Sequence, residues 1–466
     1  MGRMSTKAKN VIYIVSNDTG KFLGCYDRPI PFTPNLDRLA AEGLLFENAF
    51  CSAPCCGPSR VCAMTGKYSR TTGTLGAGNI GWCLPDAERT LVDDFNDAGF
   101  DTVHCGFIHE RRYGQMRYRF DGTAGGDESW WKCDSRLAVD KAISWLRQRD
   151  PSRRFYLNLA TNETHGSHFD GYATDTRHNG RIPAEQCWIP PAWADTPHSR
   201  ERFGNWYASL RYLDVHVGRL LSAIDELGLR EETLVIFTTD HGVAGVRGKA
   251  HVYDLGVETA LIMRLPGGAT GKVPCLTQNI DLRPTILELC GLPVPSGLDG
   301  RTFHQVLVGA EYQAHEELFV ERNFHGEWTD RNSPDFVDFY DPQRAVRTRD
   351  WHYIRHLRPG KRLKPPHSWE IRDFERIHGH GLYEPLPPPS LARPEEELYC
   401  LRGDPWELHD IAREPGCQDM LRLLSDKLGQ WMTATNDPAF RHEIPPPLQF
   451  HAEWPVAGNS VSLPRY

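Results

Sequence analysis

Three short groups of polar residues combine metal-binding side chains with side chains that carry a charge or a proton. Asn17-Asp18 and Asp240-His241 each follow an apolar run, and His104–Arg112 begins at the end of a third. Carboxylate and amide oxygens suit calcium or magnesium, whereas manganese also accepts imidazole nitrogen. A strand end is often polar only because it reaches solvent, but three groups of this composition favour one functional site.

Thirteen cysteines are scattered along the chain, and four lie close together: Cys51, Cys55, Cys56 and Cys62. No C-x-x-C pair or zinc-finger spacing occurs, so most of the cysteines are expected to be reduced thiols in the core, as in a reducing compartment. Taken alone, the run from Cys56 to Arg60, C-G-P-S-R, predicts a proline-bent loop that enters a helix and buries a thiol. Its flanking sequence changes that interpretation, as described below.

The elements that position these groups alternate between strand and helix. Apolar strands are predicted at residues 10–15, 100–104, 155–160 and 234–238, and helices at 36–42, 90–98 and 207–227. This alternation predicts an α/β fold with a mostly parallel sheet covered by helices on both faces. Active sites of such sheets form at the carboxyl ends of the strands, where the three polar groups lie.

The composition of the sequence changes near residue 330, where Pro, Arg and His become frequent. Residues 345–355 and 397–401 are predicted strands of a smaller sheet, and residues 421–432 form an amphipathic helix pattern. We therefore expect a catalytic domain at 8–330 and a smaller C-terminal domain, ending in a proline-rich tail, at 331–466.

The composition excludes several classes of protein. The 466 residues are 40% hydrophobic and 24% charged, with a net charge of −8, as in a globular protein with a substantial core. That balance gives no reason to expect nucleic acid or an anionic membrane as a partner. No run approaches the ~20 apolar residues that span a bilayer, and the first apolar run is too short for a signal peptide. We therefore expect a cytoplasmic protein, and the oligomeric state stays open.

The segment that carries Cys56, CSAPCCGPSRVCAMTGKYSRTTG, resembles the signature of the sulfatase family in the alkaline phosphatase superfamily. Further segments are similar to the family at Thr33–Ala40, Asp281–Gly291 and Glu397–Glu407. The resemblance implies an alkaline-phosphatase-like fold with a smaller C-terminal antiparallel-sheet α+β domain, and a hydrolase of sulfuric esters. It also implies that a maturation enzyme oxidises Cys56 to formylglycine, whose hydrate offers one hydroxyl for attack and a second that expels sulfate by regenerating the aldehyde.

One divalent metal ion is implied by the same resemblance, with calcium expected first and manganese or magnesium as alternatives. Its implied ligands are Asn17, Asp18, Asp240, His241 and residue 56. Asn17 departs from the family, in which many relatives carry Asp at this position. An amide oxygen still ligates a metal, but the site loses one negative charge.

Four further residues receive catalytic roles from the resemblance. Arg60 is expected to hold formylglycine through charge-assisted hydrogen bonds, and Lys249 to contact the sulfate. His165 is expected to protonate the leaving group, and His109 to take up the hydrogen when sulfate is eliminated.

The family's G-K-W-H motif is altered here, because Phe107 replaces its lysine. One sulfate-contacting cation is therefore missing from the expected site. Arg111 or Arg112 is the hypothesised substitute.

The substrate is suggested by a stretch in the C-terminal part of the chain. Glu321–His325, followed by Arg344, is similar to heparan N-sulfatase-like members. His325 or Arg344 would then line a substrate pocket, and the alternative is a structural ion pair in the smaller domain.

The expected reaction is hydrolysis of a sulfate ester or sulfamate on a small molecule or saccharide. The runner-up is phosphonate monoester or phosphodiester hydrolysis by a relative in the same superfamily. A relative that binds sulfated ligands without cleaving them is the third hypothesis, suggested by Asn17 and Phe107.

Overall fold

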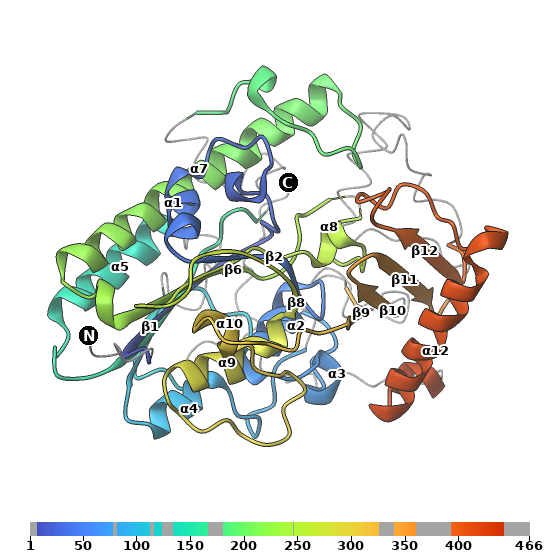
Figure 1. The fold of residues 1–466 in the computed structure, drawn as a ribbon. Helices are drawn as coiled ribbons and strands as arrows, with labels where there is room; N and C mark the ends of the chain where they lie inside the picture. Colours follow the sequence, from blue (N-terminus) through green and yellow to red (C-terminus); the bar gives the residue numbers. More distant parts are fainter. Residues whose placement is uncertain are drawn as a thin grey trace, which may run out of the picture.

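A large sheet crosses the centre of the molecule, and a small sheet lies beside it (Figure 1). The computed structural model describes residues 7–77, 82–111, 116–123, 134–165, 180–245, 247–325, 340–359 and 393–441. Arg112 and the proline-rich tail from residue 442 onward lie outside these ranges.

The large sheet contains eight of the described strands, in the order β4-β3-β5-β1-β6-β7-β2-β8. The strands are β1 (Asn10–Ser16), β2 (Leu44–Phe50), β3 (Asp101–Gly106), β4 (Phe120–Thr123), β5 (Phe155–Ala160), β6 (Thr233–Thr239), β7 (Leu261–Arg264) and β8 (Gly271–Gln278). β7 runs antiparallel to both neighbours, and the other pairs of strands are parallel. The predicted mostly parallel sheet is confirmed.

The central strands form where the sequence has continuous apolar runs. Every residue of β1 and β6 is buried, as expected when helices cover both faces of a parallel sheet. β1 pairs with β6 from Asn10 opposite Thr233 to Ser16 opposite Thr239. The two strands therefore end side by side.

Helices pack on both faces of this sheet: α1, α5 and α7 lie on one side, and α2, α4 and α9 on the other (Figure 1). The described α-helices are α1 (Pro34–Glu42), α2 (Cys56–Thr65), α3 (Ser69–Thr72), α4 (Leu91–Asp97), α5 (Ser135–Gln148), α7 (Pro197–Glu226), α8 (Asp254–Val257), α9 (Leu282–Leu289), α10 (His304–Leu307) and α12 (Gln418–Ala434). α7 begins ten residues before the predicted start at Tyr207. Thr196 caps it by accepting a hydrogen bond from the Ser199 amide, and Pro197 occupies its first turn.

The small sheet is antiparallel, in the order β12-β11-β10-β9, and α12 packs against it. Its strands are β9 (Glu317–Phe324), β10 (Tyr340–Thr348), β11 (Trp351–His356) and β12 (Glu396–Cys400). The single strand predicted at 345–355 is in fact the hairpin of β10 and β11, which turns at Arg349-Asp350. β9 belongs to this sheet, so the sheet starts before residue 331, within the range expected for the first domain.

None of the described helices is long and apolar enough to cross a membrane.

Candidate active site

The first two polar groups meet because they follow adjacent parallel strands. Asn17-Asp18 follows β1 and Asp240-His241 follows β6, and the backbone amide of Asp18 donates to Oδ1 of Asp240 at 3.0 Å. Asp18 has φ +54°, in the left-handed region that a non-glycine residue rarely adopts. Such a conformation costs about 1–3 kcal/mol and persists where the surroundings fix it. It turns the chain at the strand end, where the Asp18 carboxylate meets the side chains after β6.

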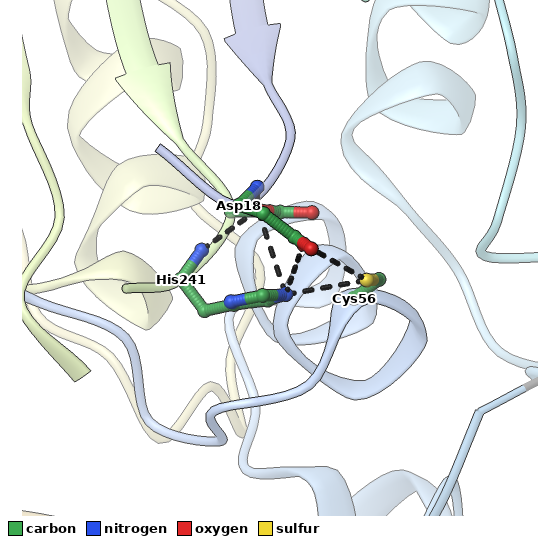
Figure 2. A group of neighbouring side chains, drawn as sticks. Asp18, Cys56 and His241 are labelled. Carbon is green, nitrogen blue, oxygen red and sulfur yellow. Dashed lines mark hydrogen bonds and ion pairs between the residues drawn. The ribbon is translucent and has the colours of Figure 1, made fainter. Parts of the chain in front are cut away.

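Cys56 is brought to the same place by the N-terminus of α2. The residue before it, Cys55, is extended, so Cys56 is the first residue of the helix. Its Sγ lies 3.2 Å from Nε2 of His241 and 3.7 Å from Oδ1 of Asp18 (Figure 2). The backbone amides of the first helical turn and the helix dipole favour negative charge at this position.

Ser59 and Asn279 fix the first turn of α2. Ser59 Oγ donates to the carbonyl of Asp240. Asn279 Nδ2 donates to both the carbonyl and Oγ of Ser59 at 3.0 Å, while its Oδ1 accepts from the amide and hydroxyl of Ser52. Neither residue was predicted from the sequence to belong to the site. Ser59 lies within the C-x-P-S-R pattern, and Asn279 directly precedes the segment from Asp281, but neither signal indicated a positioning role.

Four side chains offer one ligand atom each to a common point. The ligand atoms of Asp18, Cys56, Asp240 and His241 all lie within 4.8 Å of one another, and all four residues are buried. Nδ1 of His241 lies 2.9 Å from the carbonyl of Gly242, so this nitrogen carries the hydrogen and donates. In the neutral ring, Nε2 then presents its lone pair toward Asp18, 3.1 Å away. The set suits a divalent cation.

The Asn17 amide faces the carboxylates of Asp18 and Asp240. With one orientation of its amide, the nitrogen donates to Oδ2 of Asp240 at 2.5 Å and to Oδ1 of Asp18 at 3.2 Å. With the other orientation, its oxygen faces those same carboxylate oxygens. Oxygens that converge in this way repel each other unless a cation lies between them. The predicted ligands lie together, and in the second orientation the Asn17 oxygen adds a ligand that suits calcium, magnesium or manganese.

Lys249 balances part of this negative charge. Its Nζ donates to both oxygens of Asp18 at 3.0 Å. Burial alone would raise the pKa of Asp18, but Lys249, His165 and His241 hold it well below its usual range. Burial would likewise lower the pKa of His241, but Asp240, Cys56 and Asp18 raise it well above its usual range. The negative charges of the cluster thus favour a positive charge at its centre.

Arg60 lies between the Asp240 carboxylate and an aromatic ring. Its Nε donates to Oδ2 of Asp240 at 3.2 Å, and its guanidinium carbon lies 4.5 Å from the centre of the Phe107 ring. Both terminal nitrogens are buried without a hydrogen-bond partner among the described residues. Phe107, which replaces the expected lysine, therefore holds Arg60 by a cation–π contact. The two terminal NH₂ groups of Arg60, which interacts electrostatically with Cys56, are thus available to bind an anion.

Both predicted histidines lie at the same site. Nε2 of His165 is 3.9 Å from Oδ2 of Asp18. The His109 ring meets the Phe107 ring edge to face, with centroids 5.3 Å apart. Burial, with Arg60 and Lys249 nearby, lowers the pKa of His109 to about 3, so this imidazole is neutral at physiological pH. Figure 2 shows Asp18, Cys56 and His241, the side chains at the centre of the site.

Two of the predicted substrate-binding residues, Arg344 and Arg111, form hydrogen bonds within the protein. Arg344 is fully buried and forms a two-point ion pair with Asp437, and it also donates to Asn323 and to two backbone carbonyls. These bonds use its donors, so the structure favours the structural ion pair over a role in a substrate pocket. Arg111 donates to the carbonyls of Pro85 and Glu88, on the side of α4.

The other two predicted substrate-binding residues are His325 and Arg112. His325 is buried just after the end of β9. Arg112 lies outside the described residues.

A second group with metal-ligand types is an ion-pair network instead. Asp254, His352 and Glu407 are buried together. The Arg347 guanidinium contacts both oxygens of Asp254 at 2.9–3.1 Å, and His352 lies between Asp254 and Glu407. An arginine already occupies the position that a cation would take.

Comparisons with known proteins agree with this fold and site. A family model described as "Sulfatase" matches residues 9–292, and one described as "N-sulphoglucosamine sulphohydrolase, C-terminal" matches residues 242–376. The first match spans more than half of the chain, so the chain belongs to the sulfatase family. It is a sulfuric ester hydrolase with an alkaline-phosphatase-like fold, which confirms the predicted family, fold class and reaction class.

Curated relatives match along most of their length. The human N-sulphoglucosamine sulphohydrolase is 25% identical over 488 residues, which cover 94% of this chain and 92% of the relative. An ulvan-active sulfatase of Formosa agariphila is 25% identical over 482 residues, which cover 92% of this chain and 76% of the relative.

Solved structures share the fold. One, bound to its substrate D-glucosamine-2-N,6-O-disulfate, has a TM-score of 0.66 at 17% identity and covers 93% of this chain and 99% of its own. A phosphonate monoester hydrolase from Silicibacter pomeroyi has a TM-score of 0.65 at 16% identity and covers 91% of this chain and 95% of its own.

Proposed function

We propose that this sulfatase hydrolyses a sulfate ester or sulfamate of a saccharide, using a formylglycine made from Cys56 and one divalent metal ion, calcium in the first place. One observation carries the proposal. Cys56 begins α2 at 3.2 Å from His241, among side chains of metal-ligand types, and it interacts electrostatically with Arg60, whose two terminal nitrogens have no partner among the described residues. A reacting group at residue 56 is thus surrounded by donors and cationic groups suited to an anionic ester.

Asn17, Asp18, Asp240 and His241 are the residues that would hold the metal, which supplies a Lewis acid that neutralises sulfate oxygens and acidifies a hydroxyl. A hydrated aldehyde at residue 56 supplies the attacking hydroxyl and a second hydroxyl for release of sulfate. The N-terminus of α2 stabilises negative charge on either hydroxyl of residue 56, because the helix dipole is positive there.

The other residues act on charge and protons. Arg60 presents its two terminal nitrogens to the anion, and the Phe107 ring keeps its guanidinium in place. Lys249 donates a hydrogen bond to the Asp18 carboxylate, and its ammonium group can also interact with a sulfate oxygen. His165, beside Asp18, is placed to protonate the leaving oxygen, and the neutral His109 can accept a proton when sulfate leaves.

The saccharide class follows from the relatives. One relative is named for N-sulphoglucosamine, another for ulvan, and one structure contains a disulfated glucosamine. These names support a sulfated sugar as the substrate of this chain.

Mass spectrometry of the tryptic peptide Leu39–Arg60 tests the nucleophile. Protein made with a competent maturation enzyme should show loss of the Cys56 thiol in favour of an aldehyde that a hydrazide traps. A Cys56→Ala variant is the matched control, and Cys55→Ala should retain the aldehyde. An unmodified Cys56 in the wild-type protein would contradict the proposal.

A substrate panel tests the reaction. We expect release of sulfate from aryl and sugar sulfates, with phosphonate monoesters and phosphodiesters poorer. The rival reaction, phosphonate monoester hydrolysis, is kept in the panel because that class of enzyme shares the fold. If the sulfate esters were the poorest substrates by orders of magnitude, the rival reaction would be favoured.

A further inference from the structure

Two buried arginines of the C-terminal part converge on a single carboxylate. Arg322 of β9 and Arg393, just before β12, contact different oxygens of Asp341 in β10. Arg322 also donates to the Asp341 carbonyl at 3.1 Å, and Gln343 donates to the Asp341 carboxylate at 3.0 Å. Arg322 is 5% exposed and Arg393 is 7% exposed. One aspartate therefore faces two guanidinium groups.

The guanidinium groups keep donors without acceptors. Nε of Arg322, and Nε and Nη1 of Arg393, are buried and have no hydrogen-bond partner among the described residues. Leaving a buried charged donor unpaired is costly, so these donors call for a partner such as a bound anion or water. An anion with several acceptor oxygens would satisfy these donors together.

The charges around the pair leave it positive. Glu397 is the next nearby acid, but it already accepts hydrogen bonds from His356, Tyr253 and Tyr399 and interacts with Arg247. Burial and the charge of Arg393 lower the pKa of Arg322 to about 9, as expected for two cations sharing one counter-ion.

The pair lies next to the active site through two chain segments. Arg322 interacts with Cys55, the residue before Cys56, and Cys55 packs with Phe324 and Tyr340 at the ends of β9 and β10. On the other side, Ala250 donates to the carbonyl of Pro54 at 2.6 Å.

His251, the residue after Ala250, lies between Lys249 and the two arginines. It lies two residues after Lys249, and burial together with Arg322 and Arg393 lowers its pKa to about 3, so it stays neutral between the two groups of charges. The two arginines thus neighbour the residues that flank the reacting group.

We propose that Arg322 and Arg393 form a second anion-binding subsite that takes another acidic group of the substrate, a sulfate or a carboxylate, beside the sulfate that is cleaved. The inference rests on the proposed function, since it assumes a sulfated saccharide at residue 56. It makes the enzyme selective for sugars that carry at least two anionic groups. The two arginines are specificity residues, and small aryl sulfates do not reach them.

The test compares substrates with one and two anionic groups. Glucosamine 2-N-sulfate carries one, glucosamine 2-N,6-O-disulfate carries a second sulfate, and an N-sulfated glucosamine linked to a uronic acid carries a carboxylate. We expect wild-type kcat/KM to favour at least one doubly anionic sugar by about 10-fold or more, as for a charged hydrogen bond. The preferred sugar identifies whether sulfate or carboxylate is bound. Equal kcat/KM for all three sugars overturns the subsite.

Arg393→Gln tests the residue itself. It should remove the preference, mainly through KM, while kcat/KM for 4-nitrophenyl sulfate changes less than about twofold. Arg393→Lys keeps the charge and should lose part of the preference. Arg402→Gln, at an arginine with a 76% exposed side chain, is the control and should change neither.

The fold should tolerate Arg393→Gln, since Arg322 and Gln343 still pair with Asp341. A fall in Tm well beyond that of Arg402→Gln, or an equal loss of activity on the aryl sulfate, would identify a structural role and overturn the subsite.

A binding measurement separates this inference from the proposed function. Calorimetry with the disulfated glucosamine uses Cys56→Ala protein, which needs no catalysis. Adding Arg393→Gln to it should weaken binding by about 10-fold or more. Weaker binding would support the subsite even if the wild-type enzyme hydrolysed none of the sulfates, and unchanged binding would overturn it.

Discussion

At the scale of single residues, Asn17 sets the charge of the proposed metal-binding set. It meets the carboxylates of Asp18 and Asp240 with a neutral amide. Asn17→Asp adds a third carboxylate, so we expect calcium to bind about 10-fold more tightly or better, because attraction between charges is strong in a buried site. Isothermal titration, or the rise of Tm with calcium concentration, measures this. Asp18→Asn is the opposite control and should weaken binding; equal affinity in all three proteins would contradict the assignment.

Phe107 acts through Arg60. Phe107→Leu removes the ring under the guanidinium, and a cation–π contact of about 0.5–2 kcal/mol corresponds to roughly a 2- to 30-fold loss of kcat/KM for an aryl sulfate. Phe95→Leu is the matched control, since Phe95 is equally buried and stacks on Tyr156 away from Arg60. If both variants lose the same activity, general packing explains the effect and the Arg60 contact does not.

At the scale of elements, Asp214 joins two helices. It lies on α7, and its carboxylate accepts hydrogen bonds from the backbone amides of Asn35 and Leu36 and from the Asn35 side chain, at the start of α1. Burial raises the pKa of Asp214 from 3.8 to about 6, although these hydrogen bonds act in the other direction.

The raised pKa predicts a pH dependence with a definite sign. Between pH 4 and pH 6 the folded protein keeps the Asp214 proton and the unfolded chain has lost it, so stability falls as pH rises. Asp214→Asn removes this slope. Its free energy of unfolding relative to wild type should improve by about 2–3 kcal/mol from pH 4 to pH 7. Urea unfolding at both pH values measures this. Asp419→Asn, at a fully exposed carboxylate, should show no such change.

The elements that the sequence predicted well are those with one clear signal. β1, β5 and β6 are continuous apolar runs, and α1 has a proline start and a glycine end. The first turns of α7 are mostly polar, so the apolar period revealed only its later part. The β10–β11 hairpin was read as one strand because its turn, Arg349-Asp350, carries neither Gly nor Pro.

The candidate site was predictable for a related reason. Its ligands follow neighbouring parallel strands, so one topological rule brings Asp18 and Asp240 together. At the scale of the whole molecule no such rule exists. Arg344 pairs with Asp437, 93 residues away, and Arg322 shares Asp341 with Arg393. Nothing in the local sequence distinguishes a buried arginine of this kind from one that faces solvent.

The two sheets are joined by a buried ion pair of the same long-range type. Asp254 begins α8, a few residues after Lys249, and Arg347 of β10 contacts both its oxygens. Arg347 is 5% exposed, and its guanidinium also lies 4.9 Å from the centre of the Phe50 ring at the end of β2. The helix α8 and one strand from each sheet therefore meet at this one side chain.

Arg347→Met should destabilise the protein by about 3–5 kcal/mol, because it leaves the Asp254 carboxylate buried without its cation. Urea unfolding measures the loss. Arg402→Met breaks an exposed pair with Asp350 and should cost no more than about 1 kcal/mol. The double variant Arg347→Met/Asp254→Leu should recover part of the stability, since no lone charge remains. A double variant less stable than Arg347→Met would mean that packing around Asp254, rather than its unpaired charge, holds the two sheets together.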